Sequence, residues 1–391
     1  MKTNKTKLSF SRFLLLLSLG LVEFVRGGFF IALYPLYATN VLKLSVAWVG
    51  VILSSHYLAE TLCKPLAGVI LDRYPRRNVL GFALALGLLG LLATVSVKYP
   101  LLGLIGAIIW GAGASPIWLA VLGAGKEDGE RQGRWMSRAY TFWLIGIGLS
   151  MLLVNVLMQN YLWLVLTMLV GVWILATIAV TGTGRRTMAG ASRKKQVWAK
   201  EMASFLRRQW SVFGGVLLQT MAASMLIPIL PLFARKILGL SNIQYTIALA
   251  GGGGFAVLVM LLTGRVVDRA GPRRSLVLGF LLCGSGVALL GNHPPSSIVL
   301  MLLILTVLSM GYGLVLPAWN TFVATIIPSG RQASAWGLYT TAEGVGVSVG
   351  PAFGGVISDA YGLPAAFLVS GIVLALLGVF YALRFYFQVQ S

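Results

Sequence analysis

The sequence predicts an all-α membrane protein of twelve transmembrane helices in two pseudo-symmetric six-helix bundles. Hydrophobic residues make up 58% of its 391 residues and charged residues only 10%, a composition far from that of soluble globular domains. Apolar stretches of roughly twenty residues recur along the whole chain, and each is long enough to cross about 30 Å of hydrocarbon as a helix. The first stretch is too long for a signal peptide, so we expect it to remain in the mature protein.

The spans are expected at 13–38, 47–71, 78–97, 101–124, 139–158, 162–181, 212–234, 243–265, 275–292, 297–325, 334–358 and 365–385. The one long polar segment, 182–211, separates the sixth span from the seventh and carries eight basic residues. We therefore expect residues 1–181 and 212–391 to be two domains. The segment between them reads as a cytoplasmic linker that its basic residues hold near anionic headgroups.

The net charge is +21, and the Lys and Arg residues that produce it flank the spans and are not concentrated in one groove. With the N-terminus inside, 25 of the 31 Lys and Arg residues fall in cytoplasmic segments. This is the positive-inside bias, and it predicts a multi-pass protein of the cell membrane with both termini in the cytoplasm. The distribution argues against nucleic acid as a partner.

The two halves of the chain repeat. Pro35 near the end of the first span matches Pro231 near the end of the seventh, and Asp72 after the second span matches Asp268 after the eighth. Both pairs are separated by 196 positions. A duplicated six-helix unit with a midplane site between its copies is the architecture of alternating-access transporters.

The first span contains an acid and a base, Glu23 and Arg26, in the middle of an apolar run. An ionised group at the centre of a membrane helix costs about 2.5 to 3.5 kcal/mol, so two would not persist unless they faced a polar interior and offset each other. Their spacing of three residues places them on one helix face. We expect this face to line a substrate cavity.

The second span adds His56, Glu60 and Lys64 at intervals of four residues, again on one face. Glu60 can neutralise Lys64 there. The candidates for carrying a coupled proton are Glu23 and Glu60, followed by His56 and by Glu343, the one carboxylate inside a span of the second half.

The second half lacks these charges. At an offset of 196 the charged positions of spans one and two become Gln219, Ala222, Ala256 and Met260. A small polar solute would gain little from the apolar half of such a cavity, and a purely apolar drug would not offset the desolvation of four ionised groups. A molecule with a sugar head and acyl tails fits both halves.

The loop after spans two and eight has the pattern Gly-x-x-x-Asp-Arg followed by Arg-Arg, and it resembles the signature loop of the major facilitator superfamily. The first copy carries Pro75 where that family usually has Gly. The resemblance implies a conformational latch between neighbouring helix ends, formed here by Asp72, Arg73, Arg76, Arg77, Asp268 and Arg269.

Five further stretches resemble the glycolipid flippases of the lipoteichoic acid pathway in Gram-positive bacteria: 21–27, 115–118, 226–231, 316–322 and 350–355. The resemblance implies a proton-coupled transporter that moves a diglucosyl diacylglycerol anchor from the inner to the outer leaflet. It also implies that Glu23 and Arg26 line a polar pocket together with Trp118 and Trp143. This chain has Glu60 where the family has Asp, which keeps the charge and lengthens its reach.

Trp118 and Trp143 could stack on sugar rings. Trp319 and Asn320 give the second half a few polar groups that could contact the substrate. The sequence has no Walker loop, metal-ligand cluster or nucleophile elbow, so we expect no enzyme activity, cofactor or metal. The expected partners are a glycolipid, protons and the bilayer, and the protein should act as a monomer. The alternatives are a drug:proton antiporter of the same fold, which would have little use for Arg26 and Lys64, and a non-transporting receptor or scaffold.

Overall fold

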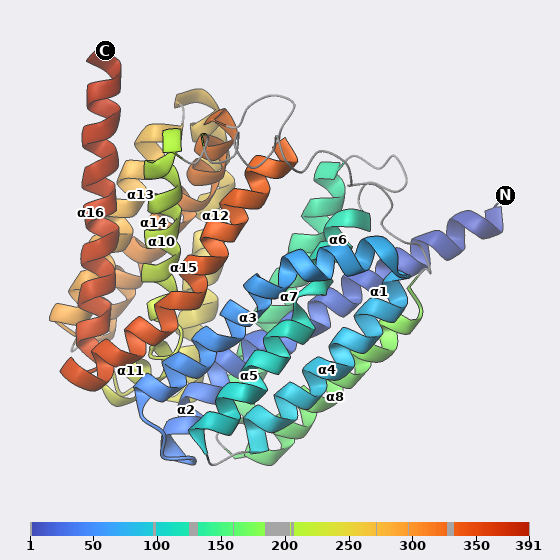
Figure 1. The fold of residues 1–391 in the computed structure, drawn as a ribbon. Coiled ribbons are helices and arrows are strands. Elements are labelled where there is room, and N and C mark those ends of the chain that lie inside the picture. Colours follow the sequence, from blue (N-terminus) through green and yellow to red (C-terminus); the bar gives the residue numbers. More distant parts are fainter. Residues whose placement is uncertain are drawn as a thin grey trace. The chain divides into compact units, whose positions relative to one another are not determined.

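The structure is a computed structural model that describes residues 2–96, 99–124, 132–158, 160–183, 204, 207–270, 272–295, 297–326 and 332–390. Its secondary structure is helical (Figure 1). The chain divides into two compact units, of which unit 1 is Met1–Leu44 with Val51–Lys194 and unit 2 is Ser45–Gly50 with Lys195–Ser391. The division at 194–195 falls inside the segment 182–211. Most of that segment lies outside the described residues, so its role as a linker stays a prediction.

Unit 1 holds the first half of the helices. They are α1 (Lys2–Gly27), the π-helix η1 (Gly28–Leu33), α2 (Tyr34–Asn40), α3 (Val46–Arg73), α4 (Arg76–Ser96), α5 (Pro100–Ala114), α6 (Pro116–Ala124), α7 (Gln132–Leu157) and α8 (Leu162–Thr181). The first turn of α3 is grouped with unit 2. There the carboxylate of Asp359 accepts hydrogen bonds from the backbone N–H groups of Val46, at 3.0 Å, and Ala47, at 2.9 Å. Because the first N–H groups of a helix have no partner within it, these bonds define where α3 begins.

Unit 2 holds the second half. Its helices are α10 (Trp210–Met225), α11 (Leu230–Lys236), α12 (Asn242–Ala270), α13 (Pro272–Asn292), α14 (Ile298–Ile326), α15 (Gln332–Tyr361) and α16 (Leu363–Gln390). A core of large side chains, including Trp319, Phe280 and Tyr381, joins α10, α13, α14 and α16.

The helix boundaries carry the internal repeat that the sequence predicts. The helices α2 and α11 both have seven residues with proline second, and they begin 196 positions apart. The same offset separates the first residues of α3 and α12, and both ends of α4 and α13. The duplication therefore extends from two short motifs to the secondary structure of the first three spans of each half.

Eleven helices among the described residues are long and apolar enough to cross a membrane. The eleventh predicted span corresponds to α15, a helix of thirty residues that falls outside this count because its composition is less apolar. The first span runs from Phe10 to Asn40 as one continuous path through α1, η1 and α2. The sequence predicts its position but not its π-helical segment, which begins at Gly28, directly after Gly27.

Two glycines set the approach of the helices that carry the charged residues. A side chain at Gly111 of α5 would overlap the carbonyl oxygen of His56 in α3, and one at Gly146 of α7 would overlap the carbonyl oxygen of Gly20 in α1. The backbones therefore pack closer than any larger residue would allow. These contacts fix α1 and α3, and with them the height of Glu23, Arg26 and Glu60, within unit 1.

We expect Gly111→Val to lower the stability of the protein by about 1 to 3 kcal/mol, because α5 must move away from α3. Thermal unfolding of the detergent-solubilised protein measures the change. Gly148→Ala is the control, because a Cβ atom there has no neighbour within 4 Å. If the Gly111→Val and Gly148→Ala proteins unfold at the same temperature, the close approach of α5 to α3 is not required for stability.

Candidate functional site

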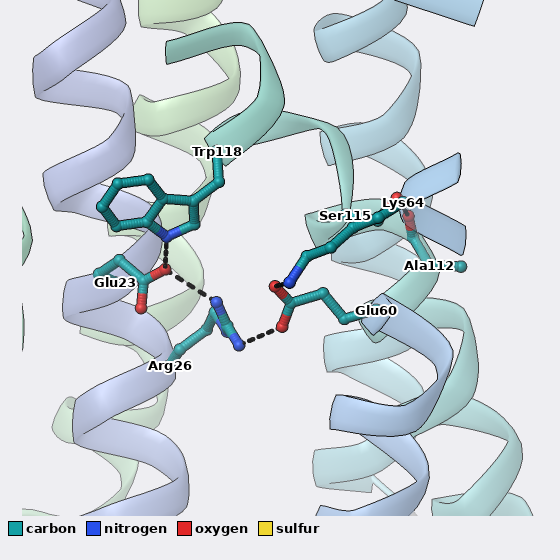
Figure 2. A network of polar contacts seen from close by, with 7 residues as sticks. All are labelled: Glu23, Arg26, Glu60, Lys64, Ala112, Ser115 and Trp118. Carbon is teal, nitrogen blue, oxygen red and sulfur yellow. Dashed lines mark hydrogen bonds and ion pairs between the residues drawn. The ribbon is translucent and has the colours of Figure 1, made fainter. Parts of the chain in front are cut away.

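Four charged side chains form a continuous chain inside unit 1 (Figure 2). The guanidinium of Arg26 donates to Glu23 Oε1 at 2.8 Å and to Glu60 Oε2 at 2.5 Å. The ammonium of Lys64 lies 3.1 Å from the other carboxylate oxygen of Glu60. Charges of opposite sign therefore alternate along the chain, and they sum to zero when both acids are ionised.

The two pairs within a helix are those that the sequence predicts. Glu23 and Arg26 meet at a spacing of three residues on α1, and Glu60 and Lys64 meet at a spacing of four on α3. The contact between Arg26 and Glu60 joins the helices across 34 positions of sequence. It turns two local pairs into one network.

Three of the four groups are removed from solvent. The exposed fraction of the side chain is 5% for Glu23, 8% for Arg26 and 7% for Glu60, whereas Lys64 keeps 35%. Buried charges are costly, and they persist only where partners and hydrogen bonds replace water. Lys64 is therefore the member of the network that a polar ligand can reach most easily.

Aromatic groups complete the surroundings of the network. The indole N–H of Trp118, on α6, donates to Glu23 Oε1 at 3.2 Å. The guanidinium of Arg26 also lies 5.5 Å from the ring centre of Tyr57, close enough for a cation–π contact. Glu23 Oε1 thus accepts from both Arg26 and Trp118, which holds the carboxylate in one orientation.

Three aromatic rings lie together beside Glu23. Trp118 is 6.5 Å from Trp143 and 5.7 Å from Tyr140 between ring centres, and Tyr140 is 6.2 Å from Trp143. Both tryptophans are half-buried and Tyr140 is exposed. The group we call the aromatic cluster, Trp118, Tyr140 and Trp143, therefore offers ring surface next to a charged chain.

His56 lies on the same helix but has a different environment. It is fully buried, with its ring 4.5 Å from Phe30, 5.3 Å from Tyr57 and 4.9 Å from Trp110 between centres. Neither ring nitrogen makes a hydrogen bond of normal geometry with a described residue. The sequence places His56 on the charged stripe, and the structure places its ring in an aromatic cage.

The candidates of the second half do not join the network of unit 1. Trp319 is buried in the core of unit 2 against Phe280 and Tyr381, so its ring presents no binding surface there. Asn320 is exposed and donates to the carbonyl of Leu316 on its own helix. Glu343 is half-buried. A substrate role for these three residues stays a prediction.

The residues of the predicted latch are only partly described. Asp72 and Arg73 are exposed, Arg77 is half-buried and Arg76 is buried. Asp72 makes no hydrogen bond or ion pair with any side chain that the structure describes. The side chains of Asp268 and Arg269 lie outside the described part of the chain, so the latch also stays a prediction.

Sequence reasoning missed two members of the site, Tyr57 and Tyr140. Helical spacing contained a signal for both, because Tyr57 precedes Glu60 by three residues and Tyr140 precedes Trp143 by three.

Among the described residues no three His, Cys, Asp or Glu side chains are grouped so that they could hold a metal ion. The site therefore offers charges, hydrogen-bond donors and ring faces.

Comparison with protein families assigns the chain as a whole. The model of the Major Facilitator Superfamily matches residues 13–216 and again 212–390. The chain belongs to this superfamily. The double match agrees with the duplication that the sequence and the helix boundaries indicate, and the superfamily consists of membrane transporters.

Among curated proteins, the chain is similar to the proton-coupled antiporter flippase LtaA of two staphylococci. It is 29% identical over 382 residues to the protein of Staphylococcus haemolyticus strain JCSC1435 and 30% identical over 378 residues to that of Staphylococcus aureus strain USA300. Each alignment covers 95% of this chain and 94% of the relative.

Among solved structures, the fold is similar to the nucleoside transporter NupG, with a TM-score of 0.80 at 16% identity over 96% of this chain and 99% of NupG. It is also similar to a bacterial homologue of the human lysosomal transporter Spinster in an inward-facing, unoccupied conformation, with a TM-score of 0.75 at 15% identity over 96% of both chains. At these identities the likeness establishes the fold alone.

We expect Arg26→Met to lower stability by about 3 to 5 kcal/mol, because it leaves Glu23 and Glu60 buried without their shared base. The triple variant Glu23→Gln, Arg26→Met, Glu60→Gln removes the buried charges together and should recover most of the loss. Thermal unfolding in detergent compares the three proteins. If Arg26→Met unfolds at the temperature of the unmodified protein, the arginine is not what stabilises the two carboxylates.

Proposed function

We propose that this protein is a proton-coupled transporter that flips a glycolipid, diglucosyl diacylglycerol, between the leaflets of the cell membrane by alternating access. The observation that carries the proposal is the chain of four charges, three of them buried, next to the aromatic cluster, in a polypeptide 30% identical over nearly its full length to a proton-coupled antiporter flippase. The membership of a transporter superfamily points away from an enzyme.

The chemistry of the site suits a sugar headgroup. The half-buried rings of Trp118 and Trp143 can pack against the apolar faces of pyranose rings, and Lys64 can donate to hydroxyls. The acyl chains need apolar surface. At the repeat positions of Arg26 and Glu60, unit 2 carries the uncharged residues Ala222 and Ala256, so these positions have no charge to desolvate.

Glu60 is the acid whose protonation would change the network most. Its carboxylate forms ion pairs with both Arg26 and Lys64, whereas the carboxylate of Glu23 accepts hydrogen bonds from Arg26 and Trp118. A proton on Glu60 removes the negative charge that two cations share and leaves the network with an excess positive charge. A proton on Glu23 leaves the link between Arg26 and Glu60 intact.

Competition between proton and substrate follows from this arrangement. When Glu60 is ionised, the network is closed and neutral, and Lys64 is oriented by its carboxylate. When Glu60 is protonated, Arg26 and Lys64 lose that orientation, and the donors that would bind sugar hydroxyls are no longer held in place. Substrate therefore binds better when Glu60 is ionised. Proton and glycolipid then bind in alternation, which is the behaviour of an antiporter. His56, in contact with Tyr57 and one turn from Glu60, is the further candidate for the proton path.

Direction and topology complete the proposal. The positive-inside distribution supports an orientation with both termini in the cytoplasm. We propose that transport runs from the inner to the outer leaflet against an inward flow of protons. We propose that one chain suffices, because the four charges and the three rings all come from unit 1 of one polypeptide. A drug:proton antiporter would need an acid in the site, but it would not need a base on each side of Glu60.

The proposed function predicts that proteoliposomes containing the protein move labelled diglucosyl diacylglycerol between leaflets, and do so faster when a pH gradient is imposed. In Glu60→Gln the ratio of the rates with and without the gradient should fall to about one, because the coupling free energy between proton and substrate is lost. A fluorescent or radiolabelled lipid with an enzyme or quencher that reaches only one leaflet gives the rate.

Lys236→Gln is the matched control, since it also removes one charge but lies at the exposed end of α11. It should keep the response to the gradient. Efflux of lipophilic cations without movement of the glycolipid would support the drug antiporter instead. Movement of the glycolipid by Glu60→Gln with an unchanged response to the gradient would remove Glu60 from the mechanism.

A second prediction separates the two roles of Trp118. Trp118→Phe keeps a ring but loses the hydrogen bond to Glu23, whereas Trp118→Ala loses both. If the ring binds sugar, Trp118→Ala should raise the KM for the glycolipid by about two- to tenfold and Trp118→Phe by much less. Equal effects of the two substitutions on KM would assign Trp118 to positioning Glu23.

A further inference from the structure

A groove of about 330 Å³ lies between α13 and α16 in unit 2, at the end of the span where the chain enters α13. The two helices run side by side (Figure 1). Ala382 of α16 lines the groove, and one turn before it, at Gly378, a Cβ atom would crowd Leu281. The helices are therefore closely packed at Gly378, and the groove opens one turn further on.

Two arginines stand at the mouth of this groove and apolar side chains form its walls. The arginines are Arg273 and Arg274, and the walls include Leu278, Leu281, Ala382 and Phe385. Both arginines are exposed, and Leu278 keeps 51% of its surface accessible. Leu278 and Leu281 lie about 6 and 10 Å deeper along the helix than Arg274. The groove therefore runs from a cationic mouth into the apolar zone of the span.

Neither Arg273 nor Arg274 makes an ion pair or a side-chain hydrogen bond with any residue that the structure describes, and no acid among those residues lines the groove. The guanidinium of Arg273 lies 5.2 Å from the ring centre of Phe385. That contact holds the guanidinium over the groove and leaves its N–H donors available.

The internal repeat shows that the fold does not require this exposure. At the offset of 196 that relates α4 to α13, Arg77 is the counterpart of Arg273, and Pro272 takes the place of Arg76. Arg77 is half-buried, whereas Arg273 is exposed above an open groove. The second copy of the motif thus presents its arginine at a groove in unit 2, whereas the first copy partly covers it in unit 1.

We propose that this groove binds one anionic phospholipid from the leaflet at this end of the span. Guanidinium groups match phosphate oxygens in geometry and charge, and basic residues at the membrane surface attract anionic headgroups. The phosphate would lie between Arg273 and Arg274, and the first part of an acyl chain along Leu278 and Leu281. The proposed transport substrate has an uncharged sugar head, and the cations proposed to bind it, Arg26 and Lys64, are paired with Glu23 and Glu60. The groove at Arg273 and Arg274 is therefore a second lipid site with a different specificity.

Native mass spectrometry of the detergent-purified full-length protein, titrated with phosphatidylglycerol or with phosphatidylcholine of the same acyl chains, tests the proposal. We expect tighter binding of phosphatidylglycerol. Arg273→Gln with Arg274→Gln should weaken it by about fivefold for each arginine removed, whereas Arg273→Lys with Arg274→Lys, which keeps the charge and loses the guanidinium geometry, should lose less. Ala382→Trp, which fills the groove and leaves both cations, should also weaken binding.

Arg207→Gln with Arg208→Gln is the matched control, because it removes two exposed cations outside the groove. It should leave the affinity for phosphatidylglycerol unchanged. Equal losses in the two double glutamine variants would mean a diffuse electrostatic attraction, and equal affinities for the two lipids would mean that the arginines do not select charge. Either result overturns the proposal, as does an Ala382→Trp protein that binds phosphatidylglycerol like the unmodified one. None of these outcomes depends on whether the protein flips a glycolipid.

Discussion

The interaction on which the site depends is the sharing of Arg26 between Glu23 and Glu60. Without it, α1 and α3 would each carry a separate pair of opposite charges, and both pairs would be local features of a helix. With it, the acid Glu60 of one helix forms an ion pair with the base Arg26 of another. Any change in charge on Glu60 therefore alters its electrostatic interaction with both Arg26 and Lys64. Low solvent access strengthens this coupling, because three of the four side chains are almost fully buried.

The glycine contacts make such a network possible. Charged side chains of different helices meet at hydrogen-bond distance only if the backbones are held at a fixed height and separation. Gly111 and Gly146 provide this by letting α5 approach α3 and α7 approach α1. The π-helical segment after Gly27 adds a local change in helical phase just beyond Arg26. Packing and electrostatics are thus two parts of one arrangement in unit 1.

Sequence alone predicts what helical periodicity determines. It predicts the spans, the repeat, and the pairs Glu23 with Arg26 and Glu60 with Lys64, because residues three or four positions apart must share a helix face. It cannot predict the contact of Arg26 with Glu60, which depends on the separation and rotation of two helices. For the same reason it does not distinguish His56, caged among aromatic rings, from Glu60 one turn away, or reveal that the ring of Trp319 lies inside a core.

Duplication followed by divergence accounts for the asymmetry of the two units. The repeat preserves helix boundaries at an offset of 196, yet the positions of Glu23, Arg26, Glu60 and Lys64 in unit 1 carry uncharged residues in unit 2. In the proposed mechanism, proton and glycolipid compete at Glu60. Adding diglucosyl diacylglycerol to the purified protein in weakly buffered detergent solution, with a pH indicator, tests this directly. Proton release by the unmodified protein and none by Glu60→Gln is the predicted result, and equal release by both proteins would contradict the account.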